Sequence, residues 1–209
     1  MVSLLIFCVV FPHHFVAITI SWLCYFLSLN PDIQRKVREE VQRILPQSSK
    51  ADMQTVKSLT YTHAVVKETM RSKNAASLLP FELEDNVDSL TLSNGMTIRT
   101  NDAVWVYIDG VLWNEDIFPR PSEFLPERWL PEHTEAGQLG KMEEAFLAFG
   151  SGPRVCPGMS LAILESVLAI AYLVQNFSIE LACDPQEIYR TMRLTSTPNK
   201  MPIKLTQLV

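Results

Sequence analysis

The chain has 209 residues, and its composition excludes several classes of protein. Hydrophobic residues make up 47% and charged residues 20%, so the chain can form a packed core and is not expected to be disordered. The formal net charge of −5, without a basic stripe, argues against nucleic acid as a partner.

The N-terminal segment 1–29 contains no Asp, Glu, Lys or Arg, and it is long enough to cross a bilayer, which takes about 20 apolar residues. The first cations after it, Arg35 and Lys36, are consistent with a cytoplasmic flank. However, Pro-His-His at 12–14 interrupts the run, and residues 15–29 would serve equally well as a buried core helix. A membrane anchor and a core helix are therefore both open interpretations.

Residues 30–45 predict an amphipathic helix. Asn30 can cap this helix, and Pro31 suits its first helical position. The apolar residues recur at the spacing of one helix face. That stripe consists of Ile33, Val37, Val41 and Ile44.

The segment 48–72 predicts a short helix, a break near Thr60 and then a second helix. The second helix carries Glu68 and Arg71, which are three residues apart and therefore share a face. Taken alone, such a spacing is typical of a surface ion pair that contributes less than ~1 kcal/mol.

The middle of the chain predicts short strands and irregular segments. Residues 89–102 alternate apolar and polar residues around Asn94-Gly95, which favours a β-hairpin with a tight primed turn. Residues 103–113 begin as a strand, and the proline-punctuated segment 119–140 predicts an ordered but irregular stretch.

The last third of the chain predicts one long helix and two strands. Residues 159–177 are apolar nearly all round, which is typical of a buried helix. Residues 178–181 and 201–207 are typical of terminal strands, with a turn at Pro198-Asn199 between them. The predicted fold class is therefore mainly α with small β-sheets, an α+β arrangement.

The segment 149–158, "FGSGPRVCPG", carries three of the seven glycines of the chain around a single cysteine. It matches no phosphate-binding glycine pattern. A cysteine nucleophile would need a histidine base, and only His63 and His133 lie outside the apolar run. A zinc site or a disulfide framework is not expected, because no Cys-x-x-Cys pair occurs. Thiolate ligation of a metal is the remaining use of Cys156.

The surroundings of Cys156 favour a flat, iron-containing ligand. Gly150, Gly152 and Gly158 allow positive φ and close approach of the backbone to such a ligand. The start of a long helix just after Cys156 stabilises a thiolate. Arg154 can bind a carboxylate through two hydrogen bonds. Heme suits both groups, because its iron can take the sulfur and its propionate can take the arginine.

At this point the sequence resembles the cytochrome P450 family of heme-thiolate monooxygenases. The family signature is Phe-x-x-Gly-x-Arg-x-Cys-x-Gly, often with a further glycine directly after the phenylalanine. It is supplied in full by Phe149, Gly150, Gly152, Arg154, Cys156 and Gly158. The resemblance implies that Cys156 is the axial ligand of iron in heme b, that Arg154 holds a propionate and that Phe149 shields the sulfur.

Two further motifs occur in the order of the family. Glu68 and Arg71 resemble its Glu-x-x-Arg helix, and residues 126–129, Pro-Glu-Arg-Trp, resemble its Pro-Glu-Arg-aromatic segment. The resemblance implies that Arg128 joins Glu68 and Arg71 in a buried structural cluster. Breaking such a cluster would strand a buried charge, at a cost of roughly 3–5 kcal/mol.

The resemblance runs from about residue 15 onward and implies one partial domain over 1–209, the C-terminal part of the cytochrome P450 fold. In this interpretation residues 1–29 are a remnant of the family's long central helix or a membrane anchor, and residues 30–209 are the heme-binding part. The acidic-Thr pair of that central helix is absent, since "FPHHFV" at 11–16 occupies its place. We therefore expect a truncated member with weak turnover, and we assign no catalytic residue.

The implied activity is the hydroxylation of an apolar small molecule, such as a fatty acid, with molecular oxygen. The implied partners are an NADPH-dependent reductase and a membrane, with the protein at the cytoplasmic face of the endoplasmic reticulum. Two alternatives stay open. One is a non-catalytic heme-binding or vestigial membrane-associated fragment, and the other is a small anchored protein whose cysteine loop is structural.

Overall fold

The computed structural model describes residues 2–46, 51–84, 86–193 and 195–208, and for residues 2–12 it describes the helical backbone. The predicted short helix from residue 48 therefore begins outside the described residues. The α-helices are α1 (Val2–Leu29), α2 (Pro31–Ile44), α3 (Met53–Lys57), α4 (Thr60–Ser72), α5 (Ile108–Leu112), α6 (Ala136–Glu144) and α7 (Met159–Asn176). Single 3-10 turns are η1 (Pro126–Trp129), η2 (Leu147–Phe149), η3 (Gly152–Arg154) and η4 (Pro185–Glu187).

The strands of the described residues form four separate two-stranded antiparallel sheets. They are β1 (Leu78–Phe81) with β4 (Val104–Tyr107), β2 (Ser89–Thr91) with β3 (Thr97–Arg99), β5 (Phe177–Leu181) with β8 (Ile203–Gln207), and β6 (Arg190–Met192) with β7 (Ser196–Pro198). The structure thus has the mainly α fold with small β-sheets that the sequence predicted.

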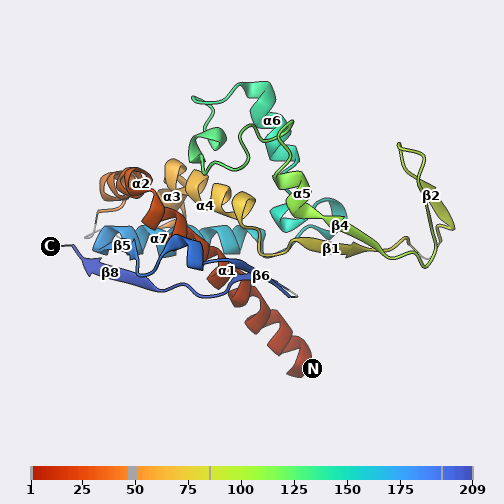
Figure 1. Ribbon diagram of the computed structural model, residues 1–209, viewed down its shortest axis with the longest axis horizontal. Coiled ribbons are helices and arrows are strands. Elements are labelled where there is room, and N and C mark those ends of the chain that lie inside the picture. The colour runs from red at the N-terminus through yellow and green to blue at the C-terminus, as the bar shows by residue number, and fades with distance from the viewer. Residues whose placement is uncertain (1, 47–50, 85, 194, 209) are drawn as a thin grey trace.

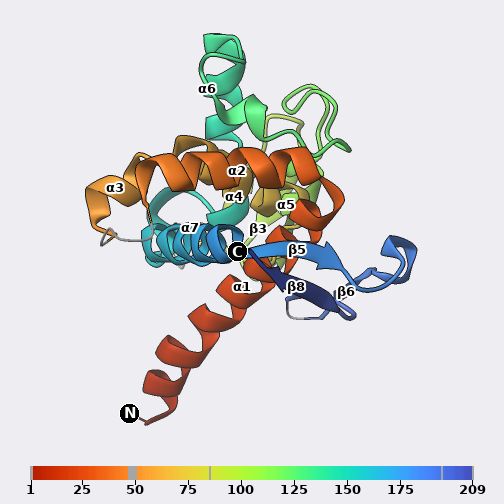
Figure 2. The ribbon, with the colours of Figure 1, turned by 90° about the vertical axis from the view of Figure 1, so that its left-hand side faces the viewer.

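The main core lies where α1, α2, α4 and α7 meet, and β5 covers one side of it (Figures 1 and 2). Leu23 and Leu27 of α1, Val41 of α2, Val65 of α4 and Ile170 of α7 are all fully buried there. Burial of a leucine or isoleucine side chain stabilises a fold by about 1.5–3 kcal/mol. This packing fixes α4 and α7, the two helices that carry or adjoin the predicted site residues.

The C-terminal half of α1 packs as a core helix in this structure. Trp22, Leu23 and Leu27 expose at most 1% of their surface, and the first turns of α1 extend away from the other elements (Figures 1 and 2). The chain bends by 113° between residues 13–29 and α2. Helix α7 is long and apolar enough to cross a bilayer. Residues 13–29 are long and apolar enough only when they are counted together with α2, as one bent span.

Four details differ from the sequence predictions. The 89–102 hairpin is confirmed, but its turn is not a tight primed one: Gly95 has φ 85° and donates its N–H to Leu92 O at 2.9 Å in a longer loop. Helix α7 is not buried all round, since Leu161 and Tyr172 are exposed. Pro198, predicted to lie in a turn, ends strand β7, and α6 begins within the stretch expected to be irregular.

The N-terminus of α4 is held by a side chain from another helix. Leu59, the residue before α4, offers no side-chain cap. Instead the buried Glu40 of α2 accepts hydrogen bonds from the backbone N–H of Tyr61 at 2.8 Å and of Thr62 at 2.7 Å. Because a carboxylate also suits the positive end of the helix dipole, Glu40 fixes where α4 starts.

Candidate functional site

Glu68 of α4 lies at the centre of a fully buried polar cluster. Arg71, one turn later, grips both its oxygens with Nε and Nη2, each at 2.9 Å. Arg128 of η1 adds a hydrogen bond from Nε at 3.1 Å. The structure therefore brings together Glu68, Arg71 and Arg128, the three residues that the sequence placed in a structural cluster. The interpretation of Glu68 and Arg71 as a surface pair does not hold, because both side chains are 0% exposed.

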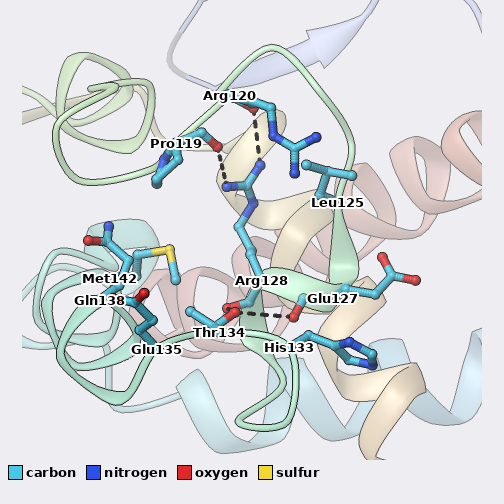
Figure 3. Close-up of a pocket in the computed structure, with 10 residues that line it drawn as sticks. All are labelled: Pro119, Arg120, Leu125, Glu127, Arg128, His133, Thr134, Glu135, Gln138 and Met142. Carbon is cyan, nitrogen blue, oxygen red and sulfur yellow. Dashed lines mark hydrogen bonds between the residues drawn. The ribbon is translucent and has the colours of Figure 1, made fainter.

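The two arginines also hold the irregular segment that precedes η1. Arg71 Nη2 donates to Pro121 O at 2.8 Å, and Arg128 Nη1 donates to Pro119 O at 2.7 Å. Figure 3 shows Arg128 reaching the carbonyl oxygens of Pro119 and Arg120 from the middle of the pocket view. Burial lowers the pKa of the Arg128 guanidinium, and the charge of Glu68 acts in the opposite direction. Arg128 nevertheless remains charged, because a guanidinium is not deprotonated in proteins.

The pocket drawn in Figure 3 has a volume of about 410 Å³ and lies beside this cluster. Its lining residues come from the 119–142 region, and none of them belongs to the cysteine segment 149–158. The polar atoms of Arg128 in it are already hydrogen-bonded to carbonyl oxygens and to Glu68. We therefore assign the pocket no part in the chemistry at Cys156.

The sequence analysis missed two groups that complete the cluster. The indole N–H of Trp129 donates to Glu68 Oε2 at 2.9 Å, and the backbone N–H of Leu125 donates to Glu68 Oε1 at 3.0 Å. The sequence could have indicated the first of these bonds. The aromatic residue of the Pro-Glu-Arg-aromatic segment is a tryptophan here, which has a ring N–H to donate, whereas a phenylalanine has none. The second depends on how the irregular segment folds back.

Glu127, next to Arg128, was also missed as a contact. Its Oε1 accepts from Lys36 Nζ at 2.7 Å and from the Tyr61 hydroxyl at 2.9 Å, so it joins α2, α4 and η1. Burial acts to raise the pKa of Glu127, but hydrogen bonds from Lys36, from the backbone N–H of Glu127 itself and from Tyr61 outweigh it together with the charge of Lys36, and the pKa is lowered. Burial, followed by the hydrogen bond to Glu127, raises the pKa of Tyr61.

The cysteine loop is built from the two 3-10 turns η2 and η3, which are separated by Gly150 and Ser151. Gly150 has φ 76° and Gly152 has φ 67°, and residues other than glycine rarely adopt this region of backbone conformation. The backbone N–H of Cys156 donates to Phe149 O at 2.9 Å, which closes the loop. Gly158 differs from the expectation: its φ is −87°, so no positive φ requires glycine there.

Gly158 has a steric role in place of the predicted backbone one. A Cβ at Gly158 would lie 3.8 Å from the sulfur of Cys156, in van der Waals contact with it. A glycine therefore keeps the space beside the sulfur open. At Gly152 a Cβ would meet nothing within 4 Å, so only its backbone conformation calls for glycine.

The side chains of the loop face outward. Cys156 is exposed, and it sits two residues before Gly158, the residue that precedes α7. Arg154 is exposed too, and its guanidinium has no hydrogen bond or ion pair with the described residues. Val155 and Met159 add exposed apolar surface at 43% and 38%. Phe149 is half-buried and packs against the main core, and its carbonyl oxygen holds Cys156.

This geometry agrees with a match over most of the chain. A sequence profile described as "Cytochrome P450" matches residues 13–205. The chain belongs to the cytochrome P450 family. Membership implies a heme cofactor, and the residues of the loop fit that group: an accessible sulfur, an unpaired guanidinium in the described structure, an open space at Gly158 and exposed apolar neighbours.

Similar proteins include cytochromes P450 of animals and an enzyme of a plant. "Probable cytochrome P450 12d1 distal, mitochondrial" of Drosophila melanogaster is 31% identical over 193 residues, covering 92% of this chain and 36% of that protein. "Cytochrome P450 2U1" of Homo sapiens is 30% identical, covering 90% of this chain and 33% of that protein. "Cheilanthifoline synthase" of Eschscholzia californica is 31% identical, covering 80% and 34%. The chain spans about a third of the length of these cytochrome P450 relatives.

Proposed function

We propose that this chain forms the heme-binding part of a heme-thiolate monooxygenase, with Cys156 as the axial ligand of iron in heme b. One observation carries the proposal. The sulfur of Cys156 is exposed in a loop whose backbone is closed by the hydrogen bond to Phe149 and turned by Gly150 and Gly152, and the nearby Arg154 side chain is exposed as well.

Each loop residue has a distinct part in this proposal. The Cys156 thiolate is the ligand, and its place just before α7 puts it near the positive end of a helix dipole, which favours the anion. Arg154 binds a heme propionate, since its guanidinium is exposed and lacks a partner among the described residues. Gly150 and Gly152 supply the positive φ angles that the loop needs, and Gly158 keeps a Cβ out of the space beside the sulfur. Phe149 limits the access of water to the sulfur.

When bound, heme supplies oxygen activation, which a thiolate ligand favours by donating electron density to iron. The proposed reaction inserts one oxygen atom into an apolar substrate such as a fatty acid, with electrons from an NADPH-dependent reductase. The proposed location is the cytoplasmic face of the endoplasmic reticulum membrane. The apolar residues of segment 1–29 and the exposed Leu78 and Phe81 after α4 support an apolar substrate or surface.

A second candidate function is heme binding without turnover. Where the resemblance led us to expect an acidic residue and a threonine, α1 carries His14 and Phe15. The His14 ring nitrogen lies 2.9 Å from Thr195 Oγ1, so this side chain already has a hydrogen-bond partner. Proton delivery to a bound ligand would then need another group.

Two measurements on the purified chain test these proposals. Heme titration followed by absorbance should show stoichiometric uptake that falls at least about tenfold in affinity in Cys156→Ala, because the iron ligand is lost. The matched control is Cys183→Ala, which removes another partly accessible thiol and should bind heme normally. Equal uptake by both variants would refute ligation by Cys156.

Turnover distinguishes the two candidate functions. The heme-loaded chain is mixed with an NADPH-dependent reductase, NADPH and a medium-chain fatty acid, and hydroxylated product is measured. Product that disappears in Cys156→Ala supports the monooxygenase. Heme uptake with no product, under conditions in which NADPH is consumed in a control cytochrome P450, supports the non-catalytic alternative.

A further inference from the structure

We propose that Lys67, Trp129 and Phe146 form a clamp that positions the cysteine loop against the buried Glu68 cluster. This inference rests on the proposed function of Cys156 as a ligand. The three residues come from α4, η1 and the turn before η2, and they are henceforth called the aromatic clamp. None of them is expected to touch heme, so they are positioning residues.

Trp129 joins the clamp to the cluster. Its indole N–H donates to Glu68 Oε2 at 2.9 Å, and only 7% of its surface is exposed. The centroid of its ring lies 5.2 Å from that of Phe146, and the two planes meet at 73°. Such an edge-to-face pair adds directional preference to simple burial. One side chain thus bonds to the cluster at one end and sets the orientation of Phe146 at the other.

Lys67 links the two rings through its charge. Its ammonium nitrogen lies 4.3 Å from the centroid of Trp129 and 5.0 Å from that of Phe146. The same nitrogen forms an ion pair with Glu143 of α6. Burial lowers the pKa of Lys67, and the bond to Glu143 acts in the opposite direction. A partly desolvated ammonium over two rings holds them more strongly than it would in water.

Phe146 passes this constraint to the cysteine loop. It is the residue immediately before η2, the turn Leu147–Phe149. Gly150 N–H donates to Leu147 O at 2.9 Å, and Cys156 N–H donates to Phe149 O at 2.9 Å. The loop is therefore tied to η2 by backbone bonds, and η2 is tied to Glu68 through the clamp. Loosening the clamp should loosen the loop while leaving the main core in place.

Two variants remove one interaction each, and a third serves as a control. Trp129→Phe keeps a ring and loses the N–H to Glu68. Lys67→Met keeps the apolar stem and loses the charge over the rings. Lys36→Met makes the same change at a lysine that also pairs with η1, through Glu127, but whose ammonium group lies over the Tyr61 ring and, within the described residues, over neither ring of the clamp.

The readout is amide hydrogen exchange in the chain without heme, compared between peptides covering 147–158 and peptides of α2 and α7. Both clamp variants should raise exchange in 147–158 on the order of fivefold or more over α2 and α7, since loss of one such contact weakens local closure. In Lys36→Met, the exchange rate of 147–158 relative to that of α2 and α7 should be the same as in the wild type. With heme added, both clamp variants should also lower the fraction of thiolate-ligated ferrous–CO complex.

Other outcomes overturn the proposal. If residues 147–158 exchanged no faster in both clamp variants than in Lys36→Met, the contacts of the clamp would not position the loop. A uniform rise across α2, α7 and 147–158 in both variants would show a role in global stability only. Because exchange is measured without heme, failure of the chain to take up heme would count against the proposed function and leave this test intact.

Discussion

The Glu68 cluster and the cysteine loop are held in opposite ways. Every polar contact of the cluster is internal: within the described residues Glu68 accepts five hydrogen bonds, and its side chain is fully buried. In the loop, the backbone and the Phe149 side chain are held by the protein, whereas the side chains of Arg154 and Cys156 are exposed. The contrast shows that the buried Glu68 cluster gives the site its rigidity, whereas the exposed side chains of Arg154 and Cys156 are available to bind a ligand.

Each arrangement has a physical reason. A buried charge without partners is costly, so Glu68, Arg71 and Arg128 must satisfy one another and the nearby carbonyl groups. A ligand-binding side chain has the opposite requirement, because a partner inside the protein would have to be displaced first. The comparison predicts that mutations in the cluster damage the fold, whereas mutations in the loop damage heme binding.

The largest effect should come from Glu68→Gln. This change leaves Arg71 and Arg128 buried beside a neutral amide and should lower the free energy of unfolding by roughly 3–5 kcal/mol. Urea denaturation followed by circular dichroism measures it. Glu39→Gln, which removes an exposed partner of Arg35 on α2, is the control and should leave the midpoint unchanged. A similar midpoint for both variants would contradict the account of the cluster.

A smaller loss is expected for Glu40→Ala. The change frees the N–H groups of Tyr61 and Thr62 at the start of α4, and it should lower the free energy of unfolding by about 2 kcal/mol. The same urea experiment measures this, with Glu39→Ala on the same helix as the reference. If Glu40→Ala were as stable as that reference, α4 would not depend on this carboxylate for its cap.

Two glycines sharpen the comparison within the loop itself. Gly152→Ala forces a side chain into positive φ and should cost about 1–2 kcal/mol, with weaker heme uptake as a consequence. Gly140→Ala, in helix α6 and with open space around it, should instead stabilise by about 0.5–1 kcal/mol. The urea unfolding curves of both variants measure these changes. A loss of stability in both variants would contradict the claim that the positive φ of Gly152 is what requires glycine there.

Alkylation of the exposed Cys156 thiol should have the smallest effect on the stability of the fold. Cys156 is exposed, whereas Cys24 is buried in the core, and burial raises the pKa of the Cys24 thiol to about 11. At pH 8 burial therefore keeps Cys24 protonated and inaccessible, so Cys156 should be alkylated first and without unfolding. Peptide mapping by mass spectrometry identifies the labelled cysteine. Labelling of Cys24 at a comparable rate would show that the core is open.

Local patterns made much of this structure predictable, and long-range contacts account for what was missed. The resemblance to the family placed Glu68, Arg71 and Arg128 in one buried cluster, whereas the spacing of Glu68 and Arg71 alone indicated a surface ion pair. The Lys67 stacking on Trp129 depends on how η1 folds back over α4, which no spacing reveals. The apolar sequence of α7 could not indicate which face stays exposed, since its residues are similar on all sides.

The central claim is that the sulfur of Cys156 binds heme iron. The most direct measurement is the absorbance spectrum of the reduced, carbon monoxide-bound chain after loading with heme, for the wild type and for Cys156→Ser. The account predicts the Soret band of a thiolate-ligated complex in the wild type and its absence in the variant. The same band in both proteins, or a wild-type spectrum without it, would contradict the account.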